Sequence, residues 1–215
     1  MIRAVFFDLD GTLVRYHGVA FESSWGALGV AAGVGELWDE LLARYRGRLE
    51  EYPDWVRENA ALLRGVPLAR VEEALFPPPY APGVREAVAA LKEAGYVLGI
   101  VSSGVSLVAD RVRDELGLAF AIANELLVAD GRFTGEAVVR VGLGEKRAVV
   151  EQEARQRGLS LGEVAFVGDH LNDIPVFAAV GCAIAYAPKE PEVARAAHAV
   201  VDHFCSIPEL VRAAS

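Results

Sequence analysis

Four short apolar segments alternate along the chain with longer segments in which apolar residues recur at helical spacing. The apolar segments are residues 4–8, 96–103, 163–169 and 181–187. Each is almost continuously apolar, a pattern typical of parallel strands that are buried on both faces of a sheet. The helical patterns between them are residues 83–95, 106–117 and 145–158, and each ends on a glycine. This alternation predicts an α/β fold with a doubly wound, Rossmann-like parallel sheet and right-handed crossovers.

Residues 16–79 interrupt this alternation. They contain helical patterns at 34–49, 53–65 and 67–76, and the last of these is stopped by three consecutive prolines. A segment of this length is too long for an ordinary connection within an α/β core. We therefore predict an inserted helical cap at 16–79, placed over the end of the first strand. Residues 1–15 and 80–215 would form the catalytic core.

A second departure from the alternation lies at residues 123–139. Asp130 and Gly131 stand there between two runs, of which one is β-prone. An Asp-Gly pair in this setting is a strong signal for a two-residue turn between antiparallel strands. The segment therefore predicts a small β-hairpin.

Composition excludes several classes of protein. The chain has 215 residues, of which 53% are hydrophobic, and its formal net charge is −9. An apolar fraction of this size argues against disorder, and the absence of a basic stripe argues against a nucleic-acid partner. No apolar run approaches the roughly 20 residues that span a bilayer, and no export signal is recognisable, so we expect a cytoplasmic protein without a membrane partner. We expect Cys182 and Cys205 to be reduced and buried. The oligomeric state is left open.

Polar side chains gather where the predicted strands end. Asp8 and Asp10 follow the first strand, Ser102 and Ser103 end another, and a later strand leads into "GDHLND". Ligands of open α/β sheets bind at this edge. Like charges repel at such short separation, so the acids need a compensating cation. Oxygen ligands together with a substrate phosphate suit Mg²⁺, which we expect as the cofactor.

The same residue types suit phosphoryl transfer. An aspartate can act as a nucleophile and form an aspartyl-phosphate, and a neighbouring acid can protonate the leaving oxygen and later activate water. Hydroxyls, backbone N–H groups and the ammonium of Lys146 would complement the negative charge on the phosphoryl oxygens. Each of these features alone is weak evidence for a function. Together they follow one another along the chain and are all expected at the same edge of the predicted sheet.

Taken together, these motifs resemble those of the haloacid dehalogenase superfamily of phosphatases. "DLDGT" resembles the first motif of that superfamily, "VSSG" the second, Lys146 the third and "GDHLND" the fourth. The hairpin and the place of the insertion are most similar to the phosphoserine phosphatase branch, although "DGT" stands here where many of its members have "DST". The resemblance covers the whole chain.

The resemblance implies roles for individual residues. Asp8 would be the nucleophile and a metal ligand, and Asp10 the general acid/base that binds the metal through its backbone carbonyl. Asp169 would be the third metal ligand, supported by Asp173. The phosphate would be held by Thr12, Ser102, Ser103, Gly104, Lys146 and Asn172.

The substrate is less clearly indicated. In the phosphoserine branch a glutamate soon after the first motif meets the substrate amine, but the corresponding position here is about His17. We expect Glu22 and Arg57 to contact substrate, since an acid and a base could bind the amine and carboxylate of an amino-acid phosphate. The favoured function is a phosphomonoesterase of a small metabolite. The alternatives are a phosphotransferase, or a phosphatase for a sugar phosphate or phosphoglycolate; a non-catalytic binding module is the least favoured.

Overall fold

The core of the molecule is one seven-stranded sheet. The computed structural model describes residues 1–215, with the exception of the side chain of Phe21. The strands are β1 (Ala4–Phe7), β2 (Val97–Val105), β3 (Phe120–Ala129), β4 (Arg132–Val138), β5 (Val164–Gly168), β6 (Cys182–Tyr186) and β7 (Ala199–Val201). Their order is β4-β3-β2-β1-β5-β6-β7, and every neighbouring pair is parallel except β3 and β4. The predicted doubly wound α/β fold is confirmed.

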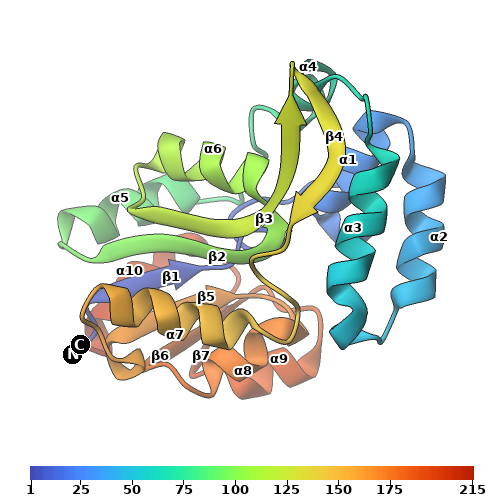
Figure 1. Ribbon diagram of the computed structural model, residues 1–215. Coiled ribbons are helices and arrows are strands. Elements are labelled where there is room, and N and C mark those ends of the chain that lie inside the picture. The colour runs from blue at the N-terminus through green and yellow to red at the C-terminus, as the bar shows by residue number, and fades with distance from the viewer.

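Helices cover both faces of this sheet (Figure 1). One face carries α5 (Val84–Glu93), α6 (Ser106–Leu116) and α10 (Ile207–Ala213), and the other carries α7 (Lys146–Gln156), α8 (Ile174–Phe177) and α9 (Pro191–Ala196). Short 3₁₀ turns lie at η3 (Leu161–Glu163), η4 (Leu171–Asp173) and η5 (Phe204–Ser206). Along β1, Val5 and Phe7 enter the first core, whereas Ala4 and Phe6 enter the second. Burial on both faces explains why the strand is apolar at every position.

Residues 16–79 form a helical group beside the sheet (Figure 1). The elements are η1 (Ala20–Glu22), α1 (Ser24–Ala32), α2 (Gly35–Tyr45), η2 (Leu49–Glu51), α3 (Tyr52–Leu62) and α4 (Leu68–Leu75). The sequence patterns predicted α2, α3 and α4 but missed α1. That helix is apolar on most sides and contains Gly26 and Gly29, which disfavour helix. Both are needed for packing, since a Cβ at Gly29 would lie 2.9 Å from the Trp38 ring, and one at Gly26 2.9 Å from the Ala20 carbonyl oxygen.

The predicted hairpin is confirmed, and both of its strands, β3 and β4, belong to the seven-stranded sheet, with β4 at the edge. Its turn places Asp130 at φ 50° and Gly131 at φ 70° between the paired residues Ala129 and Arg132. Positive φ at both central residues is the type I′ geometry that favours glycine. The hairpin stands beside α3 (Figure 1), and the Gly65 N–H just after α3 donates to the Phe133 carbonyl.

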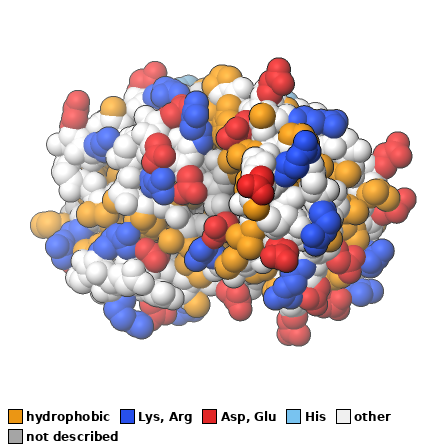
Figure 2. All heavy atoms as spheres, turned by 45° about the horizontal axis from the view of Figure 1, so that its top comes forward, with side chains coloured by type: hydrophobic (Ala, Val, Ile, Leu, Met, Phe, Trp, Pro, Cys, Tyr) orange, Lys and Arg blue, Asp and Glu red, His pale blue; other side chains and the backbone are white. Residues whose placement is uncertain are grey.

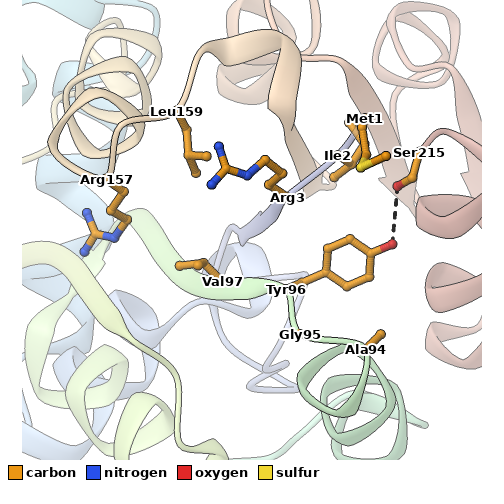
Figure 3. Close-up of a pocket in the computed structure, with 10 residues that line it drawn as sticks. All are labelled: Met1, Ile2, Arg3, Ala94, Gly95, Tyr96, Val97, Arg157, Leu159 and Ser215. Atoms are coloured by element: carbon orange, nitrogen blue, oxygen red, sulfur yellow. Dashed lines mark hydrogen bonds between the residues drawn. The ribbon is translucent and has the colours of Figure 1, made fainter.

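A cavity of about 340 Å³ lies near the starts of β1 and β2, on the side of the sheet opposite to the carboxyl ends of these strands. Figure 3 shows Arg3, Tyr96 and Ser215 around it, with the Tyr96 hydroxyl bonded to Ser215. The basic side chains that line it are already paired, Arg3 with Glu163 and Arg157 with Glu153. Both arginines that line this cavity are therefore already engaged in ion pairs.

The surface and the cysteines test other expectations. In the view of Figure 2, acidic and basic side chains are interspersed and form no basic stripe on that face. Among the described residues, no helix has both the length and the apolar character that a bilayer crossing requires. Both cysteines are free, as expected, and Cys182 is buried. The expected burial of Cys205 was wrong: Phe204 packs into the core on η5, and the next residue faces solvent.

Candidate active site

The candidate site lies where the strand order reverses, at the carboxyl ends of β1 and β5. Asp8 directly follows β1 and Asp169 directly follows β5, so adjacent parallel strands deliver the two carboxylates to one edge. Just after Asp8, Gly11 turns the chain with a backbone φ of 81°. A Cβ at Gly11 would lie 2.2 Å from an Asp169 carboxylate oxygen, so only glycine fits both the turn and the acid beside it.

A buried ammonium holds two of the acids. Lys146 Nζ lies 3.0 Å from Asp8 Oδ2 and 2.6 Å from Asp173 Oδ1, and the lysine side chain is only 1% exposed. Burial acts to lower the pKa of Lys146, but attraction to Asp173 and Asp8 outweighs it and raises the pKa above its ordinary value. This lysine is therefore a fixed positive charge at the end of β1, provided by the first residue of α7.

Asp173 is fully committed to contacts within the protein. One oxygen accepts from Lys146, and the other accepts from the backbone N–H groups of Asp169 and His170. Gly168 allows this arrangement, because a Cβ there would lie 2.4 Å from Asp173 Oδ2. The geometry favours the supporting role that the sequence indicated, in which Asp173 orients the loop that carries Asp169.

Asp8, Asp169 and Asp173 offer carboxylate oxygens that lie within 4.8 Å of one another. Burial, followed by repulsion from Asp8 and Asp173, raises the pKa of Asp169 well above its ordinary range. Thr12 donates its hydroxyl to Asp169 Oδ1 at 2.7 Å, so the predicted phosphate ligand contacts an acid here. Lys146 alone does not balance three acids. An all-oxygen donor set with excess negative charge fits a hard divalent cation.

Asp10 has a different environment from Asp8. Its two carboxylate oxygens accept from the backbone N–H and from the hydroxyl of Ser24, both at 2.7 Å. Burial raises the pKa of Asp10 to about 7, although the Ser24 hydrogen bonds act in the opposite direction. A carboxyl group with a pKa near neutrality suits general acid/base chemistry. Sequence reasoning missed Ser24; the available signal was "SSW", two serines before an apolar run, which is typical of a helix start.

The end of β2 provides the next group of predicted residues. Ser102 Oγ accepts from the Gly104 N–H, and Ser103 Oγ accepts from Asn172 Nδ2 at 3.2 Å. A Cβ at Gly104 would lie 2.5 Å from Asp10 Oδ2, so this glycine leaves room for the acid. The buried Asn172 Oδ1 has no partner. The structure therefore brings the predicted phosphate-binding residues of β2 and η4 beside the acids.

The backbone of Ser103 also ties residues 16–79 to the sheet. Its carbonyl oxygen accepts hydrogen bonds from Trp25 Nε1, the Tyr52 hydroxyl and Asn124 Nδ2. Trp55 packs against both aromatic donors, with ring centroids 5.1 Å from Trp25 and 5.3 Å from Tyr52. Helices α1 and α3 are thus fastened at the same strand end that carries the site.

The two predicted substrate residues lie in different surroundings. Glu22 is half-buried and bonds His17 Nδ1 and Lys189 Nζ, each at 3.0 Å. The hydrogen bond from Lys189, then that from His17, lowers its pKa. Arg57 is not brought to the acids: its side chain is 61% exposed and pairs with Asp54 at 2.8 Å. A substrate role for either residue stays a prediction.

Comparison with known proteins agrees with this geometry. The family model of the haloacid dehalogenase-like hydrolases matches residues 5–178. A phosphoserine phosphatase of Archaeoglobus fulgidus is 36% identical over 190 residues, which are 87% of this chain and 53% of that protein. This chain therefore spans about half the length of that relative. A phosphoserine phosphatase of Methanocaldococcus jannaschii is 32% identical over 189 residues, covering 87% of this chain and 86% of that protein.

A solved structure is similar over nearly the whole chain. It is described as a phospho-aspartyl intermediate analogue of phosphoserine phosphatase, and it is 28% identical to this chain with a TM-score of 0.77. The similarity covers 94% of this chain and 93% of the other. The likeness therefore includes the sheet that carries the acids and the helices beside it.

Proposed function

The chain belongs to the haloacid dehalogenase-like hydrolase family, and from this premise we propose that it is a Mg²⁺-dependent phosphomonoesterase. Its substrate would be a small phosphorylated metabolite, and the reaction would pass through an aspartyl-phosphate on Asp8. Phosphoserine is the first substrate to test, because two relatives bear the name phosphoserine phosphatase.

One observation carries the proposal: the Asp8 carboxylate lies 3.0 Å from a buried ammonium at the carboxyl end of the central strand. The buried lysine orients this carboxylate, and it offsets the charge that a phosphate brings. The hydroxyls and the N–H groups at the end of β2 complete the surroundings for phosphoryl oxygens. Lys146, Ser102, Ser103 and Asn172 are thus our proposed phosphate ligands, together with Gly104 and Thr12.

The steps follow from these positions. An Asp8 oxygen attacks phosphorus, the bond from phosphorus to the leaving oxygen breaks, and Asp10 gives its proton to that oxygen. Water then attacks the phosphorus of the aspartyl-phosphate and gives a proton to Asp10, which releases inorganic phosphate and restores Asp8. A pKa of about 7 lets Asp10 act as acid in the first step and as base in the second.

The proposed metal ligands are the Asp8 and Asp169 carboxylates and the Asp10 backbone carbonyl. When bound, the cation would neutralise phosphate charge and polarise the phosphoryl group. Asp173 would stay outside this set, because both of its oxygens already accept hydrogen bonds from Lys146 and from backbone N–H groups.

The test is release of inorganic phosphate from phosphoserine, sugar phosphates, phosphoglycolate and nucleotides, with Mg²⁺ and with EDTA. We expect Mg²⁺-dependent release from at least one of them, and a phosphoryl adduct on Asp8 in acid-quenched protein. No release from any substrate would contradict the proposal. Transfer of the phosphoryl group to an organic acceptor in place of water would indicate a phosphotransferase.

A further inference from the structure

Ser24 is the residue that holds Asp10 in place. Its backbone N–H reaches Asp10 Oδ1 and its hydroxyl reaches Asp10 Oδ2, each at 2.7 Å. Both oxygens of the carboxyl group are therefore engaged by a single residue. A two-point contact of this kind fixes the plane of the carboxyl group as well as its distance.

The other neighbour of the Ser24 hydroxyl shows which group is the donor in the hydrogen bond between Ser24 and Asp10. Ser24 Oγ lies 3.4 Å from the Val105 backbone nitrogen, which can only donate. The serine oxygen accepts there, so its own proton is free to point at Asp10. Ser24 is completely buried, so solvent water does not compete for the hydrogen bond from its hydroxyl to Asp10.

The position of Ser24 is itself determined by helix α1. It is the first residue of that helix, and the neighbouring Ser23 caps the helix by accepting from the Gly26 N–H. On the other side, Trp25 is fastened to the Ser103 carbonyl at the end of β2. The start of α1 is thus fixed between the sheet and the rest of residues 16–79.

We infer that Ser24 is a positioning residue for the acid step: it aims Asp10 at the leaving oxygen. This inference rests on the proposed function, in which Asp10 donates the proton.

The leaving group distinguishes this role from a structural one. An alkoxide leaves only with a proton, whereas p-nitrophenolate leaves without one. The value of kcat/KM covers the steps up to departure of the leaving group, so it excludes the later attack of water. We expect Ser24→Ala to lower kcat/KM roughly tenfold for the best alkyl phosphate and less than about threefold for p-nitrophenyl phosphate.

Ser23→Ala is the matched control, because it removes a hydroxyl at the same helix start without touching Asp10. It should change both substrates equally. In an Asp10→Ala background, Ser24→Ala should cause no further loss on the alkyl phosphate, since the group through which it acts is already gone. Thermal unfolding of each variant checks that it is folded.

Equal losses on both substrates, or a full further loss in the Asp10→Ala background, would overturn the inference and leave the proposed function intact. A wild-type protein that releases phosphate from neither substrate would instead overturn the proposed function, and the inference would fall with it.

Discussion

The strand ends and the helical group at 16–79 differ in the kinds of side chain that they bury. At the strand ends, acids and one ammonium are buried together, and Lys146 and Asp173 find partners within the protein. Among the described residues of 16–79, the buried polar side chains are Ser24 and Asn59, and the rest of the interior is mostly aromatic or aliphatic. Charge, which phosphoryl transfer requires, is thus concentrated on the rigid sheet. The helices contribute mainly shape, and they reach the charged site through Ser24 and the Ser103 carbonyl.

The largest effect should come from the nucleophile. Asp8→Asn should lower phosphate release by at least ~10⁴-fold, because an amide cannot form the acyl phosphate, while its similar shape preserves the fold. Steady-state assays and thermal unfolding measure the two properties. Asp39→Asn, an exposed acid on α2, is the matched control. Near wild-type turnover of Asp8→Asn, with deamidation excluded by mass spectrometry, would remove the chemistry from the strand end.

Loss of the buried ammonium should be the next most damaging change. Lys146→Ala should lower kcat by ~10²–10³, because charge beside Asp8 and the phosphoryl group is no longer offset. It should also lower the unfolding midpoint, since Asp8 and Asp173 lose their shared cation. Lys92→Ala, which removes an ammonium far from the site, is the control. An unchanged kcat would exclude Lys146 from the reaction.

Removal of the metal tests whether the acids at the strand ends bind a cation. Excess EDTA should abolish activity, and added Mg²⁺ should restore it, because three acids lie close together and Lys146 is paired with only two of them. Asp169→Ala should raise the Mg²⁺ concentration for half-maximal activity by on the order of 10- to 100-fold. Full activity in EDTA would refute a metal at this site.

The sequence was sufficient for the part of the molecule that depends on local pattern. Continuous apolar strands, glycine-ended helices and Asp130-Gly131 carry their own periodicity or turn chemistry, so the core and the hairpin were predictable. The residues at the strand ends were predictable as a group because parallel strands deliver them to one edge. The roles assigned to them remain predictions.

Long-range contacts account for what the sequence did not provide. Helix α1 gives no amphipathic signal, because it packs on several sides and its glycines serve close contacts with Trp38 and Ala20. The bond from Ser24 to Asp10 joins residues that are far apart in any local pattern. Strand β7 (Ala199–Val201) is too short to show alternation.

A smaller effect concerns stability against pH. The pKa of Asp10 is raised from 3.8 to about 7 in the folded protein, so between these values the folded state binds more protons than the unfolded state. Stability of the metal-free protein should therefore fall as pH rises from about 4 to about 7. Asp10→Asn should reduce this slope, and each change of about 1 kcal/mol in the free energy of unfolding would move the unfolding midpoint by about 2–4 °C. Identical pH profiles for both proteins would contradict the buried position of this acid.

The smallest effect should come from Arg57, which the sequence predicted to contact substrate. Its guanidinium is mostly exposed and pairs with Asp54 one helical turn away, and such surface pairs contribute about 0–1 kcal/mol. We therefore expect Arg57→Ala to change kcat/KM by less than about twofold, equally for the best alkyl phosphate and for p-nitrophenyl phosphate. Glu22→Gln is the more informative variant, because the Glu22 carboxylate links η1 to Lys189 of the core. If Arg57→Ala instead caused a selective loss for an amino-acid phosphate, the helices would contribute charge as well as shape, and the division between the two regions would fail at that residue.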